Sequence, residues 1–203
     1  MLIRRKKKEK PKNEMLVRVV TLVRIPVALV FAVFLVVFYD QHAENLMENT
    51  NLLLAAWGMI AIIEGTDILD GFLARQLDSV TEFGAMLDPF ADSVSRVTVF
   101  WSLAHVGLAM PAVPLVLAIR DVTVAYCRIR LVQENRSVAA NLSGKTKAVV
   151  QGFGAAGLVL APLYAHWTGL GCEMELLSWT VMIATAASAV QYVVAALIPG
   201  GEA

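Results

Sequence analysis

The sequence predicts an all-α integral membrane protein with six transmembrane helices and both termini in the cytoplasm. Three observations support this: the overall composition, a series of six apolar stretches, and the distribution of basic residues between them. Of the 203 residues, 58% are hydrophobic and only 17% are charged, and the mean hydropathy is +0.65. A soluble domain of this length is rarely so apolar. The two cysteines, Cys127 and Cys172, form no disulfide or metal-binding pattern.

The chain begins with a basic segment. Residues 1–14 contain seven Lys and Arg residues, and we expect residues 1–18 to form a cytoplasmic tail that contacts anionic lipid headgroups. Residues 15–24 would form an amphipathic entry to the first span. The apolar run at residues 19–39 is long enough to cross a bilayer and has no small-residue cleavage site, so a signal peptide is not favoured. The basic cluster has no folded domain around it, and we expect no nucleic-acid partner.

Five more apolar stretches follow, each close to the ~20 residues that a spanning helix needs. They cover residues 51–67, 93–109, 112–131, 148–167 and 176–198. Pro111 and Pro114 mark a tight turn between the third and fourth spans. We therefore expect one membrane domain over residues 19–198 and a short tail over residues 199–203. Small residues in the last two spans, such as Gly154 and Ala187, would let helices approach closely within one subunit or across a homodimer.

The positions of the charged residues predict the orientation. If the N-terminus is inside, the outer loops are residues 40–50, 107–112 and 168–175, and none of them contains Lys or Arg. All 17 basic residues then lie in the tail, the inner loops or the inner parts of helices, as the positive-inside rule requires. The connection between the second and third spans is therefore expected at the cytoplasmic face.

Four aspartates gather at this connection in two helical pairs. Asp67 and Asp70 are spaced i,i+3 at the end of the second span, and Asp88 and Asp92 are spaced i,i+4 at the start of the third, so each pair shares a helix face. Four converging carboxylates require a cation, and their oxygens are the ligands that Mg²⁺ and Mn²⁺ prefer. Pro89 is expected in a first helical turn, next to the positive end of the helix dipole. The structural alternative is ion pairing with Arg75, Arg96, Arg120, Arg128 or Arg130.

The residues around these aspartates suit a nucleotide diphosphate. Gly71, Ala74 and Gly84 lack bulk, and Arg75 offers a planar, permanently charged group that fits a phosphate. Two carboxylate pairs could hold two divalent ions, which bind a diphosphate and stabilise a leaving phosphate. A carboxylate at the edge of the site could also accept the proton of an attacking hydroxyl.

Together these residues form the pattern Asp-x2-Asp-Gly-x2-Ala-Arg-x8-Gly-x3-Asp-x3-Asp, met at all eight fixed positions over residues 67–92. The pattern resembles the signature of the CDP-alcohol phosphotransferases, six-span membrane enzymes of phospholipid synthesis. The resemblance implies that Asp67, Asp70 and Asp88 hold divalent metal ions, and that Asp92 contacts metal and acts as the general base. It also implies a CDP pocket lined by Gly71, Ala74, Arg75 and Gly84.

Within this family, residues 21–196 are most similar to the bacterial phosphatidylglycerophosphate synthases. That similarity implies CDP-diacylglycerol as the donor and glycerol 3-phosphate as the acceptor. Two departures leave the acceptor open: Asp121 follows Arg120 where a Glu is usual, and Ser93 follows the last aspartate where a Lys is usual. Inositol phosphate, serine or another alcohol are the alternative acceptors. Outside this chemistry, the alternative is a divalent-cation transporter or a structural membrane protein.

The phosphate of the acceptor needs cations, and four residues on the inner side are candidates: Arg120, Arg128, Lys145 and Lys147. Each is equally well explained as an interfacial charge that sets the topology. Glu64 lies one turn before the first aspartate and has no assigned role. The three histidines, His42, His105 and His166, are expected toward the outer side, away from the acids.

Overall fold

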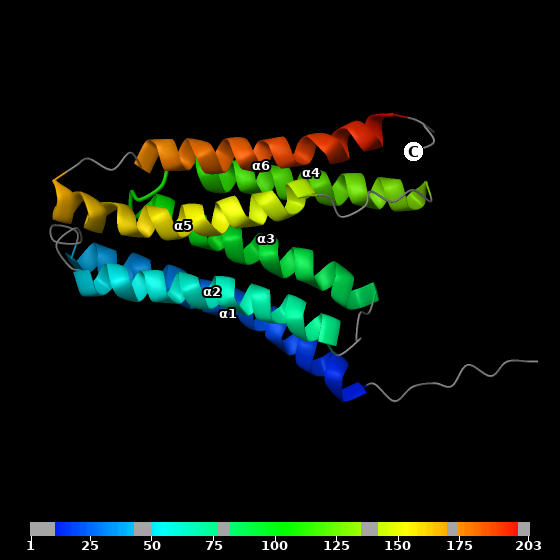
Figure 1. Cartoon of the computed structure of the whole chain (residues 1–203), viewed down its shortest axis with the longest axis horizontal. Coiled ribbons are helices and arrows are strands. Elements are labelled where there is room, and N and C mark those ends of the chain that lie inside the picture. Colours follow the sequence, from blue (N-terminus) through cyan, green and yellow to red (C-terminus); the bar gives the residue numbers. More distant parts are fainter. Residues whose placement is uncertain (1–10, 43–49, 77–81, 135–141, 170–173, 199–203) are drawn as a thin grey trace, which may run out of the picture.

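The computed structural model is a bundle of six α-helices that run back and forth along one long axis (Figure 1). It describes residues 11–42, 50–76, 82–134, 142–169 and 174–198, and only the helical backbone at 11–20, 39–42, 67–76, 82–86 and 142–145. The helices are α1 (Pro11–His42), α2 (Thr50–Gln76), α3 (Glu82–His105), α4 (Ala112–Gln133), α5 (Leu142–Thr168) and α6 (Met174–Leu197). The predicted all-α class is confirmed, with one helix for each predicted span.

Three helices are long and apolar enough to cross a membrane: α1 over Thr21–Phe38, α5 over Thr146–Thr168 and α6 over Met174–Leu197. Helix α2 contains a shorter apolar stretch, Thr50–Thr66. Helices α3 and α4 fall short because their inner faces carry charged residues, among them Asp92, Arg96, Arg120 and Asp121. Membrane spanning is therefore supported by length and composition for three helices, and a total of six spans stays a prediction.

The outer surface of α4 is nevertheless apolar. Five of its exposed side chains recur at helical spacing along one face, namely Leu115, Ile119, Val122, Tyr126 and Ile129. A helix of a soluble bundle turns such a stripe toward the core. Here the stripe faces outward while Arg120 and Asp121 are nearly inaccessible to solvent, which is the arrangement expected of a helix surrounded by lipid.

Two helices are longer than predicted. The aspartates are predicted at the end of the second span and at the start of the third, whereas α2 continues to Gln76 and α3 begins at Glu82. All four aspartates therefore lie within helices, and Pro89 lies inside α3 instead of in its first turn. Hydropathy marks where the apolar core of a bilayer would end, whereas a helix continues as long as its residues tolerate helical geometry. The helix dipole acts over about one turn, so it gives no direct support to Asp92.

Helix α3 lies at the centre of the bundle, where it contacts α1, α4 and α5. The core includes Phe31, Phe100, Leu103, Leu117 and Leu158, all fully buried. Helix α2 packs on α1 and α5, and α6 packs on α4 and α5.

The close approach predicted for small residues is confirmed between α5 and α6, because a Cβ added at Gly154 would collide with the side chain of Val181. The predicted turn before α4 is also present. Gly107 adopts a φ of 76° there, a left-handed conformation that favours glycine, and Pro111 is the N-cap residue of α4.

The two ends of the bundle differ in chemistry. Figure 1 shows the C-terminal end of α2 and the first turns of α3 and α5 together at one end, where α1 begins and α6 ends. The four aspartates and Lys147 lie at this end of the bundle, near the end of α2 and the starts of α3 and α5. The final turns of α1, α3 and α5, which carry His42, His105 and His166, lie at the opposite end. The predicted separation of the histidines from the acids is confirmed.

Candidate active site

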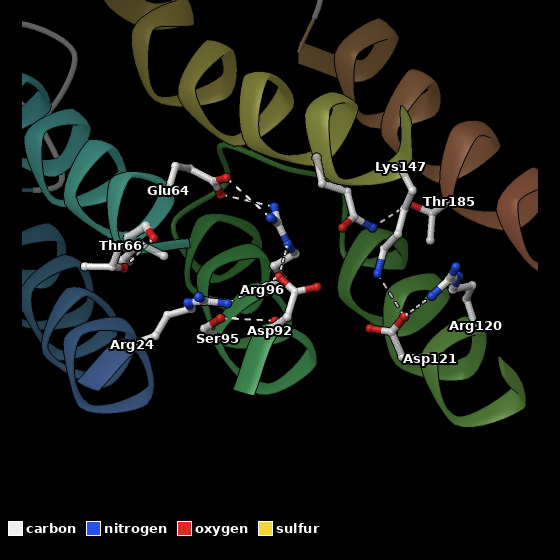
Figure 2. Close-up of polar contacts among 12 residues, drawn as sticks. Arg24, Glu64, Thr66, Asp92, Ser95, Arg96, Arg120, Asp121, Lys147 and Thr185 are labelled. Atoms are coloured by element: carbon white, nitrogen blue, oxygen red, sulfur yellow. Dashed lines mark hydrogen bonds and ion pairs between the residues drawn. The ribbon is translucent and has the colours of Figure 1, made fainter. Parts of the chain in front are cut away.

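Asp92 lies on α3 between two polar clusters (Figure 2). Its Oδ1 accepts a hydrogen bond of 2.6 Å from Nε of Arg96, and Nη1 of Arg24 on α1 lies 3.9 Å from the same oxygen. Both arginines are buried, and the side chain of Asp92 is 26% exposed. The ion-pair interpretation is thus correct for Asp92 and Arg96, whose i,i+4 spacing is visible in the sequence. Figure 2 shows the second carboxylate oxygen of Asp92 directed toward the cluster on α4 and α5.

Arg96 also connects α3 to α2. Its Nη1 and Nη2 donate to the two carboxylate oxygens of Glu64 at 3.1 Å and 3.3 Å. This contact could not be predicted from the sequence, because the two residues are 32 positions apart and nothing in their spacing pairs them. We refer to Glu64, Arg96 and Asp92 as the Glu64–Arg96–Asp92 chain.

Asp88, one turn before Asp92, is exposed and accepts a hydrogen bond of 3.0 Å from the Thr21 hydroxyl of α1. Within the part of the chain that the structure describes, its carboxylate forms no ion pair. An exposed carboxylate that is bonded to a neutral hydroxyl, one turn from a second carboxylate, fits the oxygen-donor chemistry of a Mg²⁺ or Mn²⁺ site.

The other half of the predicted donor set, Asp67 and Asp70, lies on the backbone of α2, but the side chains are outside the described residues. Among the side chains that are described, no group of three or more His, Cys, Asp or Glu could hold a metal ion. The predicted CDP-pocket residues Gly71, Ala74, Arg75 and Gly84 are outside the described side chains as well. Convergence of the four aspartates on metal therefore stays a prediction.

A second cluster, formed by Arg120, Asp121 and Lys147, lies on α4 and α5. The Oδ1 atom of Asp121 accepts hydrogen bonds from Nη1 of Arg120 at 2.8 Å and from Nζ of Lys147 at 3.0 Å. All three side chains are at most 9% exposed. Arg120 also donates from Nε to the Ser188 hydroxyl on α6 at 2.9 Å. Two buried cations share one carboxylate, so the cluster carries a net positive charge.

The structure therefore brings together two of the four predicted acceptor candidates, Arg120 and Lys147. Arg128 also faces α6, but it is exposed and is bound to Tyr192. Its Nη2 donates to the tyrosine hydroxyl at 3.1 Å, and its guanidinium lies 5.1 Å from the ring centroid. The side chain of Lys145 is outside the described residues. Sequence reasoning noted Asp121 only as a departure from a family pattern and missed that it joins the two cations.

A cavity of about 310 Å³ lies between α2 and α5 and reaches the ion pair of Glu64 and Arg96. Its remaining lining is apolar or glycine and includes Trp57 and Phe153, which are exposed on the outer surface of the bundle. The ion pair therefore borders a space with a mainly apolar lining.

An apolar helical bundle with carboxylates and buried cations at one end has the features of a membrane-embedded enzyme that handles phosphorylated substrates. Residues 15–195 match the family model of the CDP-alcohol phosphatidyltransferases. The chain belongs to this family and is a transferase of the membrane, in a family that generally depends on divalent metal ions. The predicted family is confirmed, and the transporter and structural alternatives are wrong.

Several relatives have names that specify a reaction. Over 143 residues the chain is 30% identical to the CDP-diacylglycerol–glycerol-3-phosphate 3-phosphatidyltransferase of Bacillus subtilis. The aligned region covers 70% of this chain and 74% of the relative. It is 30% identical over 148 residues to a probable phosphatidylglycerophosphate synthase of Mycobacterium tuberculosis, covering 73% of this chain and 66% of the relative. A similarly named transferase of Pseudomonas fluorescens is 33% identical over 113 residues, covering 54% and 52%.

Proposed function

We propose that this enzyme transfers the phosphatidyl group of CDP-diacylglycerol to glycerol 3-phosphate, forming phosphatidylglycerophosphate and releasing CMP. The relatives' names support both substrates. The structural observation that carries the proposal is the position of Asp92. One of its oxygens is fixed by Arg96, and the other is directed toward the buried cations Arg120 and Lys147. A base beside two cations suits an acceptor that has both a hydroxyl and a phosphate.

The donor would bind at the carboxylate end of α2 and α3. Asp67, Asp70, Asp88 and Asp92 would hold the divalent ions, Mg²⁺ or Mn²⁺, with two ions expected. Bound there, such ions would neutralise the diphosphate charge and favour departure of CMP. The CDP moiety would be lined by Gly71, Ala74, Arg75 and Gly84, and the acyl chains would stay among the membrane lipids.

Asp92 would be the general base of the transfer. Since Arg96 occupies Oδ1, the second oxygen would accept the proton of the acceptor hydroxyl. The hydroxyl oxygen would then bond to the lipid-side phosphorus as the bond from that phosphorus to CMP breaks. Arg120 and Lys147 would bind the acceptor's phosphate, which would compete with Asp121 for their donors. Correct positioning of both substrates would supply much of the rate enhancement.

We propose that all six helices span the membrane, with both termini and the active site on the cytoplasmic side. The absence of Lys and Arg from the predicted outer loops supports this orientation, and the apolar outer stripe of α4 supports spanning by that helix. A homodimer is proposed through small exposed residues of α6, such as Ala186 and Ala187. The orientation can be tested by introducing a cysteine into each loop of the protein and labelling it in right-side-out vesicles. Crosslinking in native membranes tests the dimer.

The test of function is CMP release by the purified protein in lipid, with Mg²⁺, CDP-diacylglycerol and a panel of acceptors. Release that depends on glycerol 3-phosphate and stops on addition of EDTA would support the proposal. Because Ser93 and Asp121 depart from the family pattern, inositol phosphate and serine belong in the panel, and release with one of them alone would reassign the acceptor. No release with any acceptor would refute the proposed function.

A further inference from the structure

The contacts of Arg96 link the two helices that carry the two halves of the aspartate motif. Within the described residues, α2 packs mainly on α1 and α5 rather than on α3. Arg96 of α3 nevertheless reaches Glu64 of α2 through both terminal nitrogens and holds Asp92 through Nε. The guanidinium is thus shared between one residue that belongs to the motif and one that does not.

The geometry of these three hydrogen bonds has a mechanical consequence. A guanidinium is planar, and two parallel bonds to one carboxylate fix both its plane and its direction. Once Glu64 holds Nη1 and Nη2, the direction of the Nε–H bond is fixed too. That bond, at 2.6 Å, ends on Oδ1 of Asp92, so the position of Glu64 determines which way the Asp92 carboxylate is turned.

Stability alone is a poor explanation for this arrangement. The Arg96 side chain is 6% exposed and that of Glu64, which borders an apolar cavity, is 30% exposed, so the guanidinium loses most of its hydration and the carboxylate loses part of it. A buried ion pair often contributes no more to stability than well-packed apolar residues of the same volume, because desolvation offsets the attraction. The pair is more readily explained by a requirement for orientation.

A glycine on α5 keeps space for Glu64. A Cβ added at Gly152 would lie 2.8 Å from Oε2 of Glu64, closer than side-chain carbons come to such atoms. A larger residue at this position would force the flexible end of the Glu64 side chain, which carries the carboxylate bound to Arg96, to shift. Three helices thus contribute to one contact: α2 supplies the carboxylate, α3 the guanidinium, and α5 the free space.

We infer that Glu64 is a positioning residue for Asp92, acting through Arg96, and that Gly152 is required for its placement. This inference rests on the proposed role of Asp92 in the transfer. Glu64 does not contact substrate. It determines the direction in which the second oxygen of Asp92 is presented to the acceptor hydroxyl.

The first test is Glu64→Gln in the purified enzyme in lipid, assayed by CMP release. Gln keeps the size of the side chain but cannot form a two-point ion pair. Outer-shell partners of reactive or metal-binding groups typically affect activity about 10- to 100-fold. We therefore expect kcat to fall by that factor, with KM for both substrates within about twofold of the parent, as expected for an interaction that matters in the transition state. Glu134→Gln is the matched control, because it removes a Glu from an exposed pair with Arg130 at 3.3 Å, and its kcat should equal that of the parent.

The second test leaves every charge in place. Gly152→Ala should lower kcat as Glu64→Gln does, because its methyl group displaces the Glu64 carboxylate. Gly157→Ala, on the same helix, would place its Cβ 3.6 Å from Leu177, an ordinary contact, and should behave like the parent. This pair of variants carries the test if Glu64→Gln fails to fold.

A double-mutant cycle tests whether Glu64 acts through Arg96. In an Arg96→Gln background, Glu64→Gln should cause little further loss of kcat, since the intermediary is gone. Additive losses, or a fall in kcat matched by a lower unfolding temperature, would indicate a purely structural role and overturn the inference.

Parent-like turnover of both Glu64→Gln and Gly152→Ala, with Asp92→Asn inactive, would overturn the inference while the proposed function stands. Parent-like turnover of Asp92→Asn, or no CMP release by the parent, would instead refute the proposed function and the inference with it.

Discussion

Replacing Asp121 with Asn should destabilise the bundle by about 3–5 kcal/mol, because it leaves two buried cations without their shared counter-ion. Arg120 and Lys147 approach the same carboxylate oxygen at 2.8 Å and 3.0 Å, and all three side chains are nearly inaccessible to solvent. Asn has the same shape but no charge. The change therefore isolates the electrostatic contribution from packing.

The magnitude follows from the two distances. At such separations, each cation is attracted to the carboxylate by on the order of 6 kcal/mol for an effective dielectric constant of 20. Desolvation of the three charges offsets most of this sum in the parent. In the variant the desolvation of both cations remains, and their mutual repulsion is no longer compensated. Arg120 keeps its hydrogen bond to Ser188, which limits the loss, so the range measured for broken buried pairs applies.

The assay is reversible unfolding in mixed micelles with an increasing fraction of denaturing detergent, followed by far-ultraviolet circular dichroism. Glu134→Gln is the control, because the Arg130–Glu134 pair has side chains 49% and 37% exposed, and such pairs contribute about 0–1 kcal/mol. Added glycerol 3-phosphate should stabilise Asp121→Asn more than the parent, since its phosphate would replace the missing anion. If Asp121→Asn loses no more stability than the control, the cations are not dependent on that carboxylate and the electrostatic reasoning is refuted.

Three further predictions concern the same region and the packing behind it. Asp92→Asn should reduce CMP release by about 100- to 10,000-fold, the usual contribution of a general base, while binding of CDP measured by calorimetry persists; retained turnover would rule out the base. Lys147→Met should raise KM for glycerol 3-phosphate at least about tenfold through loss of a charge-assisted bond, with KM for CDP-diacylglycerol unchanged; equal effects on both substrates would contradict a phosphate-binding role. Gly154→Ala should lower stability by about 1–3 kcal/mol through overpacking against Val181, whereas Gly157→Ala should not, and equal melting temperatures for the two would contradict the close α5–α6 contact.

The number and order of the helices could be predicted from the sequence because each helix contains one predominantly apolar stretch. The boundaries next to the aspartates could not be predicted in the same way. Residues 68–76 and 82–92 are rich in polar and small residues, yet both segments are helical. Hydropathy reports the preference of a segment for lipid, and that preference changes before the helix ends. Pro89 was misleading for a related reason, since proline favours a first turn but is also tolerated inside a helix whose neighbours accommodate it.

In the candidate site, too, some residues could be predicted from the sequence and others could not. The aspartates and Arg96 could be recognised because the motif and the i,i+4 spacing are local in sequence. Glu64 and Asp121 could not, since their partners come from other helices and depend on how α2, α4 and α5 pack around α3. Gly152 contained a faint signal, as a small residue in an apolar helix. Its importance becomes clear only when the Glu64 carboxylate is seen beside it.

The contacts of Asp92 reconcile two interpretations of this residue, one as a member of a structural ion pair and the other as a metal ligand and general base. An aspartate whose whole carboxylate is taken up by ion pairs would be a poor metal ligand and a poor base. Here the two nearby arginines, Arg24 and Arg96, both approach the same oxygen, Oδ1. Glu64 contributes a second negative charge to this group, so that among the described side chains two arginines face two carboxylates, and Asp92 does not neutralise both alone. The ion pairs at Oδ1 would thus have more than a structural role. They would orient the carboxylate so that its other oxygen faces the acceptor hydroxyl.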